Sequence, residues 1–374
     1  MDRKSTWYDV IIAGAGVLGV SLAYHLSLKK PSLRILVIEK EKMVAVHASG
    51  RNAGMIRHLY RHPRLTEWAL RSSKSWPTDL KSEVFKKTGS VITGRKIPNH
   101  GQGLFSEGKM KFSNSTELYS YVFSPEDGLI DSWKLVQGLK KRAESFGVDF
   151  YHGAEIHKVK KSKNKYEATL LTGENFFGNC FVNSLGAWAS KGMEENLLYY
   201  VPLKAYARYL YLCRTNDREL NFGEFLPASF GFFWDEVNEW YCRKWSENEW
   251  LFSVCETIPA DPDLYSPNES GIHVLTKRLE TILPDVLNSL SLVSCWHCFR
   301  TYAPDLLPVW GEHLEFSGYF FLSAFGGFGM STSFAAAEDA ACYILGEEVS
   351  VCSDFLPERF QSLDNNLFKA SVNG

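Results

Sequence analysis

A glycine-rich turn between an apolar strand and a helix is the feature that most constrains the fold. Residues 8–13 form a short β-branched run, which is typical of a strand buried on both faces. Gly14, Gly16 and Gly19 follow it, and the pattern of residues 20–27 predicts a helix. The first glycine permits a tight turn, the second lets the backbone approach a pyrophosphate, and the third lets the helix pack closely against the strand.

The next predicted strand ends in an acidic residue that suits a nucleotide site. Residues 34–38 predict a strand that is apolar from position 35 onward, and Glu39 follows at about the spacing at which a carboxylate binds the ribose of a dinucleotide. An acid there fits a free 2′-hydroxyl, as in FAD or NAD, and disfavours NADP. Backbone N–H groups at the helix start would face the phosphates. The residues predicted for this part of the site are Gly14, Gly16, Val17, Leu18, Gly19, Glu39 and Lys40.

Composition restricts the classes of function that remain. A chain of 374 residues with 45% hydrophobic residues can bury a substantial core in one large or two intimate domains. Its formal net charge of -2 gives no broad electrostatic case for nucleic acid or an acidic membrane. Glycines interrupt the apolar run 10–26, so we interpret it as strand plus helix and not as a signal peptide. We expect a reduced, cytoplasmic protein with at most peripheral membrane contact.

Four segments together resemble one family of flavoenzymes. Residues 46–57 are small and polar, residues 181–188 predict a strand ending in a glycine turn, and residues 296–305 precede a glycine-rich stretch at 318–331. In their order and spacing these segments are similar to the D-amino-acid-oxidase-like family, which includes glycine oxidase, sarcosine oxidase and bacterial D-amino-acid dehydrogenases. The resemblance implies FAD, because a purely NAD-dependent enzyme would not need a C-terminal glycine turn that returns to the cofactor.

The resemblance also extends the predicted cofactor site. The segment after Glu39 is expected to pass beside the flavin, and the helix after the last glycine turn is expected to present N–H groups to it. The additional predicted residues are Ser49, Arg51, Asn52, Ala53, Gly54, Ile156, Gly186, Gly326, Gly327, Phe328, Gly329, Met330 and Ser331.

The element pattern predicts an α/β fold. Helices are expected at 68–80 and 132–146 and strands at 151–159 and 166–172, while the aromatic-rich block 201–254 predicts a mainly antiparallel sheet. The family organisation implies a discontinuous Rossmann-like FAD-binding domain with an inserted substrate-binding domain. We assign residues 1–85, 125–195 and 295–374 to the first, and residues 86–124 and 196–294 to the second.

The resemblance implies oxidation of the C–N bond of a small amino acid or N-methyl amino acid. Hydride transfer to flavin would give an imine that hydrolyses to an oxo acid. D-amino acids are among the expected substrates, although chirality stays open, and oxygen, a quinone or another carrier would accept the electrons. Two alternatives remain: an FAD-dependent 2-hydroxy-acid dehydrogenase, and an FAD-binding protein without catalysis.

Arginine is the side chain to expect at a carboxylate site, because its planar fork matches a carboxylate. Arg300 is the first candidate, since glycine oxidase and the D-amino-acid dehydrogenases carry a substrate-binding arginine in the matching strand. Arg57 is the second, because residues 55–60 are similar to a substrate-binding stretch of sarcosine oxidase. The lysine that shares this task in sarcosine oxidase falls at Ser331.

Side chains of the middle sheet complete the catalytic candidates. Lys204, Tyr206 and Arg208 alternate with period two and share one face, and we favour Tyr206 for the pocket while leaving Arg208 open. Tyr241 and Arg243 are weaker candidates, because solvent exposure would explain them equally well.

His47 and Cys298 raise the question of how FAD is attached. His47 matches a histidine near the active site of the D-amino-acid dehydrogenases, and it could act as the base of a hydroxy-acid dehydrogenase. Some relatives link FAD covalently through a histidine in this context or through a cysteine at the position of Cys298. A non-covalent cofactor is the expectation. No metal site is expected, because Cys295 and Cys298 would point to opposite faces of a strand.

Overall fold

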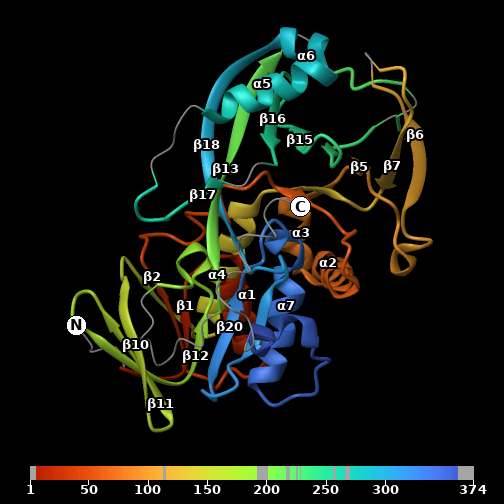
Figure 1. Cartoon of the computed structure of the whole chain (residues 1–374). Helices are drawn as coiled ribbons and strands as arrows, with labels where there is room; N and C mark the ends of the chain where they lie inside the picture. The colour runs from red at the N-terminus through yellow and green to blue at the C-terminus, as the bar shows by residue number, and fades with distance from the viewer. Residues whose placement is uncertain are drawn as a thin grey trace.

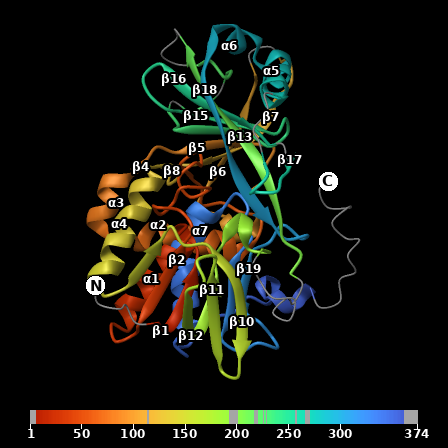
Figure 2. The same cartoon turned by 90° about the vertical axis from the view of Figure 1, so that its left-hand side faces the viewer.

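Two large β-sheets lie one above the other in the computed structural model (Figure 1). The structure describes residues 6–112, 115–191, 201–215, 220–224, 226–227, 229–255, 258–265 and 270–360. Two long paired strands, β13 (Lys204–Thr215) and β18 (Leu290–Tyr302), run from the upper sheet toward the lower one, as Figure 2 also shows.

The lower sheet contains the glycine motif and is parallel at its centre. Its strand order is β10-β11-β12-β1-β2-β9, and β20 pairs with β12 and with β19. The pairs β12–β1, β1–β2, β2–β9 and β12–β20 are parallel, so the carboxyl ends of these strands meet at one edge. The strands are β1 (Trp7–Ala13), β2 (Ile35–Glu39), β9 (Asp149–His152), β10 (Ile156–Ser162), β11 (Lys165–Leu170), β12 (Asn175–Asn183), β19 (Val309–Glu312) and β20 (Tyr319–Ser323).

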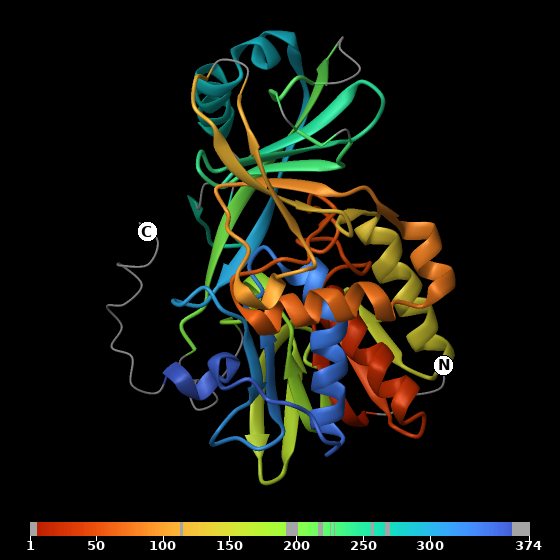
Figure 3. The same cartoon turned by 90° about the vertical axis from the view of Figure 1, so that its right-hand side faces the viewer.

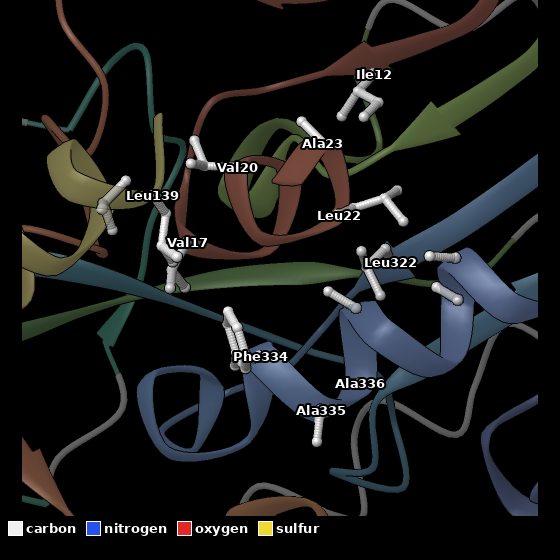
Figure 4. Close-up of a cluster of buried hydrophobic side chains, with 14 of the residues drawn as sticks. Ile12, Val17, Val20, Leu22, Ala23, Leu139, Leu322, Phe334, Ala335 and Ala336 are labelled. Atoms are coloured by element: carbon white, nitrogen blue, oxygen red, sulfur yellow. The ribbon is translucent and has the colours of Figure 1, made fainter. Parts of the chain in front are cut away.

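Helices pack on one face of the lower sheet (Figure 3). They are α1 (Val17–Lys29), α2 (Pro63–Ser75), α3 (Thr78–Val84), α4 (Ser132–Ser145) and α7 (Gly329–Ile344). Alternate residues of β1, such as Val10 and Ile12, join the buried cluster formed with these helices, whereas Ile11 belongs to the cluster on the other face. Figure 4 shows α1 packed against α7 through Leu22 and Ala336 together with their neighbours.

Two predicted elements are wrong in detail. The helix expected at 68–80 is two helices, because Trp76 is extended (ψ 142°) before Pro77, and a residue that precedes proline disfavours the helical region. The strand expected at 151–159 is divided between β9 and β10, which are separated by Gly153 at φ 67°. The predicted helix at 132–146 and the strand at 166–172 correspond to α4 and β11.

The upper sheet is mainly antiparallel and rich in aromatic residues. Its order is β17-β13-β16-β15-β14-β5-β7-β6, with β18 also paired to β13, and only β14–β5 is parallel among its described pairs. The helices α5 (Ser270–Ile282) and α6 (Pro284–Ser289) contribute to the cluster on one face. The remaining strands are β5 (Ser90–Thr93), β6 (Ser106–Met110), β7 (Tyr119–Ser124), β14 (Phe232–Asp235), β15 (Trp240–Lys244), β16 (Glu249–Val254) and β17 (Ile258–Pro259).

A small third sheet connects the two regions. It contains β3 (Met55–Ile56), β8 (Gly128–Ile130) and β4 (Phe85–Lys87), in the order β3-β8-β4. Short 3₁₀ turns complete the described elements: η1 (Asn99–Gly101), η2 (Gly186–Trp188), η4 (Ser353–Phe355) and η5 (Pro357–Phe360). The expected α/β class, with both parallel and antiparallel sheets, is confirmed.

The division into domains stays a prediction, and two strands run across its boundaries: β4 spans the one between residues 85 and 86. The boundary that we drew between residues 294 and 295 falls inside β18, which pairs along its length with β13. Parts of the predicted segments, including 196–200 and 361–374, lie outside the described residues. Among the described helices, none combines the length and the apolar character needed to cross a bilayer.

Candidate active site

A cavity of about 440 Å³ extends from the glycine motif of the lower sheet to the face of the upper sheet. The turn after β1 forms its first wall. Gly14 has φ 97°, and a Cβ atom added there would lie 2.7 Å from the carbonyl oxygen of Ser184. Only glycine therefore fits this turn without strain. Val17, at the start of α1, donates its backbone N–H to Ser49 Oγ at 2.9 Å.

Gly19 serves packing and does not line the cavity. A Cβ atom on Gly19 would collide with the carbonyl oxygen of Gly14 and would lie 2.6 Å from Ser184 Oγ. The third glycine of the motif thus allows α1 to approach the turn, which is the role that its spacing suggests.

Glu39 closes the same end of the cavity at the carboxyl end of β2. Its carboxylate accepts hydrogen bonds from the backbone N–H groups of Ala15 at 2.8 Å and Glu41 at 2.9 Å. Burial raises the pKa of Glu39, although these two donors oppose the shift. Lys40, beside it, places Nζ 3.6 Å from the centroid of the Trp188 ring. This end offers an acceptor for hydroxyl groups next to the helix start.

The small polar segment after Glu39 forms one side of the cavity. Asn52 holds this segment in place through its side chain. Its Nδ2 donates to the carbonyl oxygens of Ala48 at 3.1 Å and Ser49 at 2.8 Å, and its Oδ1 accepts from the backbone N–H of Gly54 at 2.7 Å. These bonds are local, so the segment holds its shape largely through its own residues.

His47 lies on the cavity wall beside acidic and aromatic partners. Its Nε2 is 2.9 Å from Glu41 Oε1, and its ring centroid is 4.5 Å from that of Trp188. Burial lowers the pKa of His47, with the Glu41 hydrogen bond acting in the opposite direction. Within the described chain, no contact joins His47 to Arg57 or Arg300.

The C-terminal glycine turn forms the opposite end of the cavity. It follows β20, with Gly326 at φ 46°, and leads into α7 at Gly329. A Cβ atom on Gly327 would lie 2.9 Å from Nη1 and 3.0 Å from Cζ of Arg300. The guanidinium of Arg300 therefore lies directly against this turn.

Most of the predicted cofactor residues line this one cavity. Those that do are Gly14, Gly16, Val17, Leu18, Glu39, Lys40, Ser49, Asn52, Ala53, Gly54, Ile156, Gly186, Gly326, Gly327, Gly329 and Met330. Those that do not are Gly19, Arg51, Phe328 and Ser331. Ser331 instead accepts a hydrogen bond from the backbone N–H of Arg57 at 3.0 Å, and the Phe328 ring packs against Tyr60.

Both candidate arginines, Arg300 and Arg57, line the cavity. Arg57 follows β3, is 7% exposed, and places Cζ 4.0 Å from the centroid of the Trp234 ring. Its Nη1 is buried and has no hydrogen-bond partner. Buried charges are ordinarily paired, so an arginine in this condition is prepared for an anionic ligand.

Tyr206 is buried but does not line the cavity. It lies opposite Arg300 in the pairing of β13 with β18, and its ring packs 5.8 Å from that of Tyr302. Arg208, two residues further on the same face, is also buried, and its Nε and Nη1 have no hydrogen-bond partner. Lys204 is exposed, so the three residues do not enter the pocket together.

Tyr241 and Trp234 contribute more than the sequence indicated. Both are buried and line the cavity, and their ring centroids are 4.7 Å apart. Burial raises the pKa of Tyr241, so its hydroxyl stays protonated, while the charges of Arg300 and Arg208 act in the opposite direction. Trp234 was not identified from the sequence. Its period-two spacing within an aromatic strand was a signal, but nothing in the sequence showed which face meets the cavity.

Cys298 also lines the cavity; it precedes Arg300 by two residues on β18 and so lies on the same face of the strand. Burial raises its pKa, which favours the thiol over the reactive thiolate. Cys295, three residues earlier, is exposed, as expected for residues on opposite faces of a strand.

One group of possible metal ligands lies outside the cavity. The ligand atoms of His62, Cys352 and Asp354 are within 4.8 Å of one another, near the surface. His62 Nε2 and Asp354 Oδ2 are 3.1 Å apart, which a simple hydrogen bond explains. The absence of a metal remains a prediction.

The geometry of the cavity fits a dinucleotide that ends in a reactive ring. At both ends lie glycines whose added Cβ atom would meet neighbouring protein atoms, such as Gly14 and Gly327. A partly buried carboxylate lies at one end, and a helix begins at each glycine turn. These are the features that FAD requires from its protein, and the residues present therefore fit this cofactor.

Comparisons with known proteins agree with this geometry. Residues 9–343 match the model of the family described as FAD dependent oxidoreductase. The chain is 24% identical over 385 aligned positions to monomeric sarcosine oxidase of Bacillus sp. (strain NS-129), covering 90% of this chain and 92% of that protein.

Two solved structures share the fold over nearly the whole chain. The L-proline dehydrogenase of P. horikoshii has a TM-score of 0.79 at 18% identity and covers 95% of this chain and 98% of its own. The glycine oxidase of Geobacillus kaustophilus has a TM-score of 0.78 at 20% identity, and the match covers 95% of this chain and 99% of the glycine oxidase. At these identities the two structures establish the arrangement of the chain and not its substrate.

Proposed function

This chain belongs to the FAD-dependent oxidoreductase family, and from that premise we propose that it oxidises the C–N bond of a small amino acid or N-methyl amino acid. The observation that carries the proposal is the position of Arg300. Its guanidinium lies against Gly327 at one end of the cavity, and no ion pair joins it to any acidic residue in the described part of the chain. A substrate carboxylate supplies the missing charge and fits the planar fork.

The proposed reaction needs little chemistry from the protein. The chemistry that FAD supplies when bound is the acceptance of a hydride equivalent from the substrate carbon. The substrate ammonium loses one proton to solvent, the Cα–H bond breaks with both of its electrons, and a C=N bond forms. Water adds to this imine, ammonia or an amine leaves, and a 2-oxo acid remains. Oxygen or a quinone then removes the two electrons from the enzyme.

The residues of this chain hold the substrate and shield it. Arg300 binds the carboxylate and so fixes the position of Cα relative to the glycine turn. Trp234 and Tyr241 line the same cavity with two adjacent buried rings, which would exclude water from the reacting carbon. The protonated hydroxyl of Tyr241 is available to donate a hydrogen bond to the bound substrate.

An alternative substrate, a 2-hydroxy acid, would use the same arginine but would need a base for its hydroxyl proton. His47 was the candidate for that base, yet its described contacts are with Glu41 and Trp188. For this reason we favour the amino acid.

The test is anaerobic mixing of the purified flavoprotein with separate D-amino acids, L-amino acids, glycine, sarcosine and 2-hydroxy acids. Bleaching of the flavin absorbance by an amino or N-methyl amino acid is the expected result, and the D and L panels assign chirality. Air re-oxidation afterwards distinguishes an oxidase from a dehydrogenase. Bleaching by hydroxy acids alone would overturn the proposal.

A cytoplasmic location is also proposed. All eight cysteines are free, including the buried Cys213 and Cys242, which suits a reducing compartment. Fractionation of cells that express the full chain tests this location, with recovery in the periplasmic or extracellular fraction as the contrary outcome.

A further inference from the structure

Two arginines line the cavity, and neither has an acidic partner within the described residues. Arg57 and Arg300 take part in none of the ion pairs, and their guanidinium groups donate no hydrogen bond to the described chain. Arginine cannot shed its charge at neutral pH, so burial without a counter-ion is costly unless a ligand supplies one. One carboxylate occupies one planar fork. The cavity therefore has one arginine more than a monocarboxylic substrate needs.

The surroundings of Arg57 indicate that its missing partner is an anion. The charge of Arg57 acts on Arg95, which is itself paired with Glu236 and also donates to the carbonyl oxygen of Leu59 at 2.7 Å. Burial lowers the pKa of Arg95, and the positive charge of Arg57 lowers it further. An anion bound at Arg57 would relieve this repulsion.

Arg57 and Arg300 contact different residues of the cavity wall. Arg57 stacks on Trp234 at 4.0 Å, whereas Arg300 lies against Gly327 and acts electrostatically on Tyr241. The Trp234 and Tyr241 rings are adjacent, with centroids 4.7 Å apart. A short aliphatic chain lying along these rings would reach one guanidinium with each end.

Acidic side chains do line the cavity, but elsewhere. They are Glu39, which accepts a hydrogen bond from the backbone of the glycine turn, Asp263, which pairs with Lys191 and Trp188, and the exposed Glu155. None of the three forms an ion pair or hydrogen bond with Arg57 or Arg300 in the described chain, so the part of the cavity that these arginines face carries positive charge.

We propose that the substrate is a dicarboxylic amino acid, whose α-carboxylate binds Arg300 and whose second acidic group binds Arg57. This inference rests on the proposed function and adds the substrate class. It distinguishes the site from one in which both arginines clamp a single carboxylate.

Matched pairs of substrates test the proposal. Aspartate and glutamate, as both enantiomers, are compared with asparagine and glutamine, which have nearly the same shape but a neutral amide in place of the second acid. In anaerobic stopped-flow reduction of the holoenzyme, we expect kcat/KM for the better acidic substrate to exceed that of its amide by about 100-fold or more.

Variants of Arg57 and Arg300 then show which arginine binds the second acidic group of the substrate. Arg57→Met is expected to lower kcat/KM for the acidic substrate about 100-fold more than for its amide, whereas Arg300→Met lowers both by similar factors. Arg57→Lys keeps the charge and should restore part of the preference, which guards against loss of folding as an explanation. Arg214→Met, an exposed arginine of β13 paired with Glu249, is the control.

A binding measurement separates this inference from the proposed function. Succinate and glutarate are titrated into the oxidised holoenzyme against their monoamides, and the perturbation of the flavin spectrum reports affinity without turnover. Tighter binding of the diacids, lost in Arg57→Met, supports the inference even if no amino acid reduces the flavin. Equal binding of diacids and monoamides, or equal losses for both substrate classes in Arg57→Met, would overturn it.

Discussion

The two ends of the cavity solve the problem of binding charge in different ways. At the glycine motif the contacts come from backbone groups, a helix start and the partly buried carboxylate of Glu39, each of whose oxygens accepts one hydrogen bond, from Ala15 or from Glu41. At the other end the contacts come from side chains of separate strands, above all Arg57 and Arg300, which have no protein counter-ion within the described chain.

The two ends differ in whether their buried basic side chains can lose their charge. His25, on α1 in the nucleotide-binding half, is buried against Phe334, and burial lowers its pKa to about 3, so it is neutral in the folded protein. An arginine has no such option. A buried histidine such as His25 thus needs no counter-ion, whereas Arg57 and Arg300 do, and in our proposal the ligand supplies it.

Arg300→Met should produce the largest effect on the reacting end. Removal of a buried partner of a carboxylate costs about 2–5 kcal/mol, so we expect kcat/KM for flavin reduction to fall by about 1000-fold. The FAD content should remain at one per chain, because the glycine motif is untouched. Stopped-flow reduction and the flavin-to-protein ratio measure the two quantities. Unchanged reduction would remove the distinction between the two ends.

Gly14→Ala should break the nucleotide end instead. Its φ of 97° and the 2.7 Å approach to Ser184 leave no place for a Cβ atom. We expect FAD affinity to fall by about 100-fold, roughly 3 kcal/mol. Equilibrium dialysis of the apoprotein with FAD provides the measurement, and Gly147→Ala, where a Cβ atom meets nothing within 4 Å at a similar φ of 89°, is a matched control for backbone strain. Equal losses in the two variants would show that the close approach is unimportant.

His25→Phe sharpens the comparison through pH. The folded pKa of about 3 lies below the unfolded value of about 6.5, so the unfolded state binds more protons, and the stability of the wild type falls as pH drops below about 6.5. By pH 5 this loss amounts to about 2 kcal/mol. Urea denaturation at pH 7.5 and pH 5 should show a smaller difference in unfolding free energy for the variant. The same difference in both proteins would mean that His25 is not the buried neutral group described above.

Glu39→Gln should have the smallest effect of the series. The amide retains one acceptor oxygen but places an NH₂ group near the N–H groups of Ala15 or Glu41. We expect FAD affinity to fall by about 10-fold, roughly 1.4 kcal/mol, with the reduction rate of the bound flavin nearly unchanged. Fluorescence titration with FAD measures the affinity. A large loss of reduction rate with normal affinity would place Glu39 at the reacting end.

The sequence predicted the residues that line the glycine-motif end of the cavity better than those at the arginine end, for a physical reason. The turn at Gly14, the approach at Gly19 and the acid at Glu39 are local features of one strand–helix–strand unit, so their spacing is visible in the chain. The predicted helix at 68–80 was wrong only because the extended backbone at Trp76, before Pro77, divides it into two helices.

The reacting end depends on which face of each strand turns toward the cavity. Position along a face matters too: Tyr206 and Arg300 are direct partners in the antiparallel β13–β18 pair and share a face, yet only Arg300 lines the cavity, while the Tyr206 ring packs on Tyr302. Trp234 lines it as well, although its sequence context resembles that of the other aromatic strands. Periodicity groups residues by face, but tertiary packing decides which face, and which part of that face, borders the cavity.

Product analysis of a single anaerobic turnover tests the central claim most directly. The holoenzyme is mixed with an amino acid that bleaches it, and the oxo acid and the released ammonia or methylamine are counted against the FAD that has been reduced. Cleavage of a C–N bond predicts one oxo acid and one ammonia or amine for each reduced FAD. Reduction of FAD by the substrate without release of nitrogen would contradict the account.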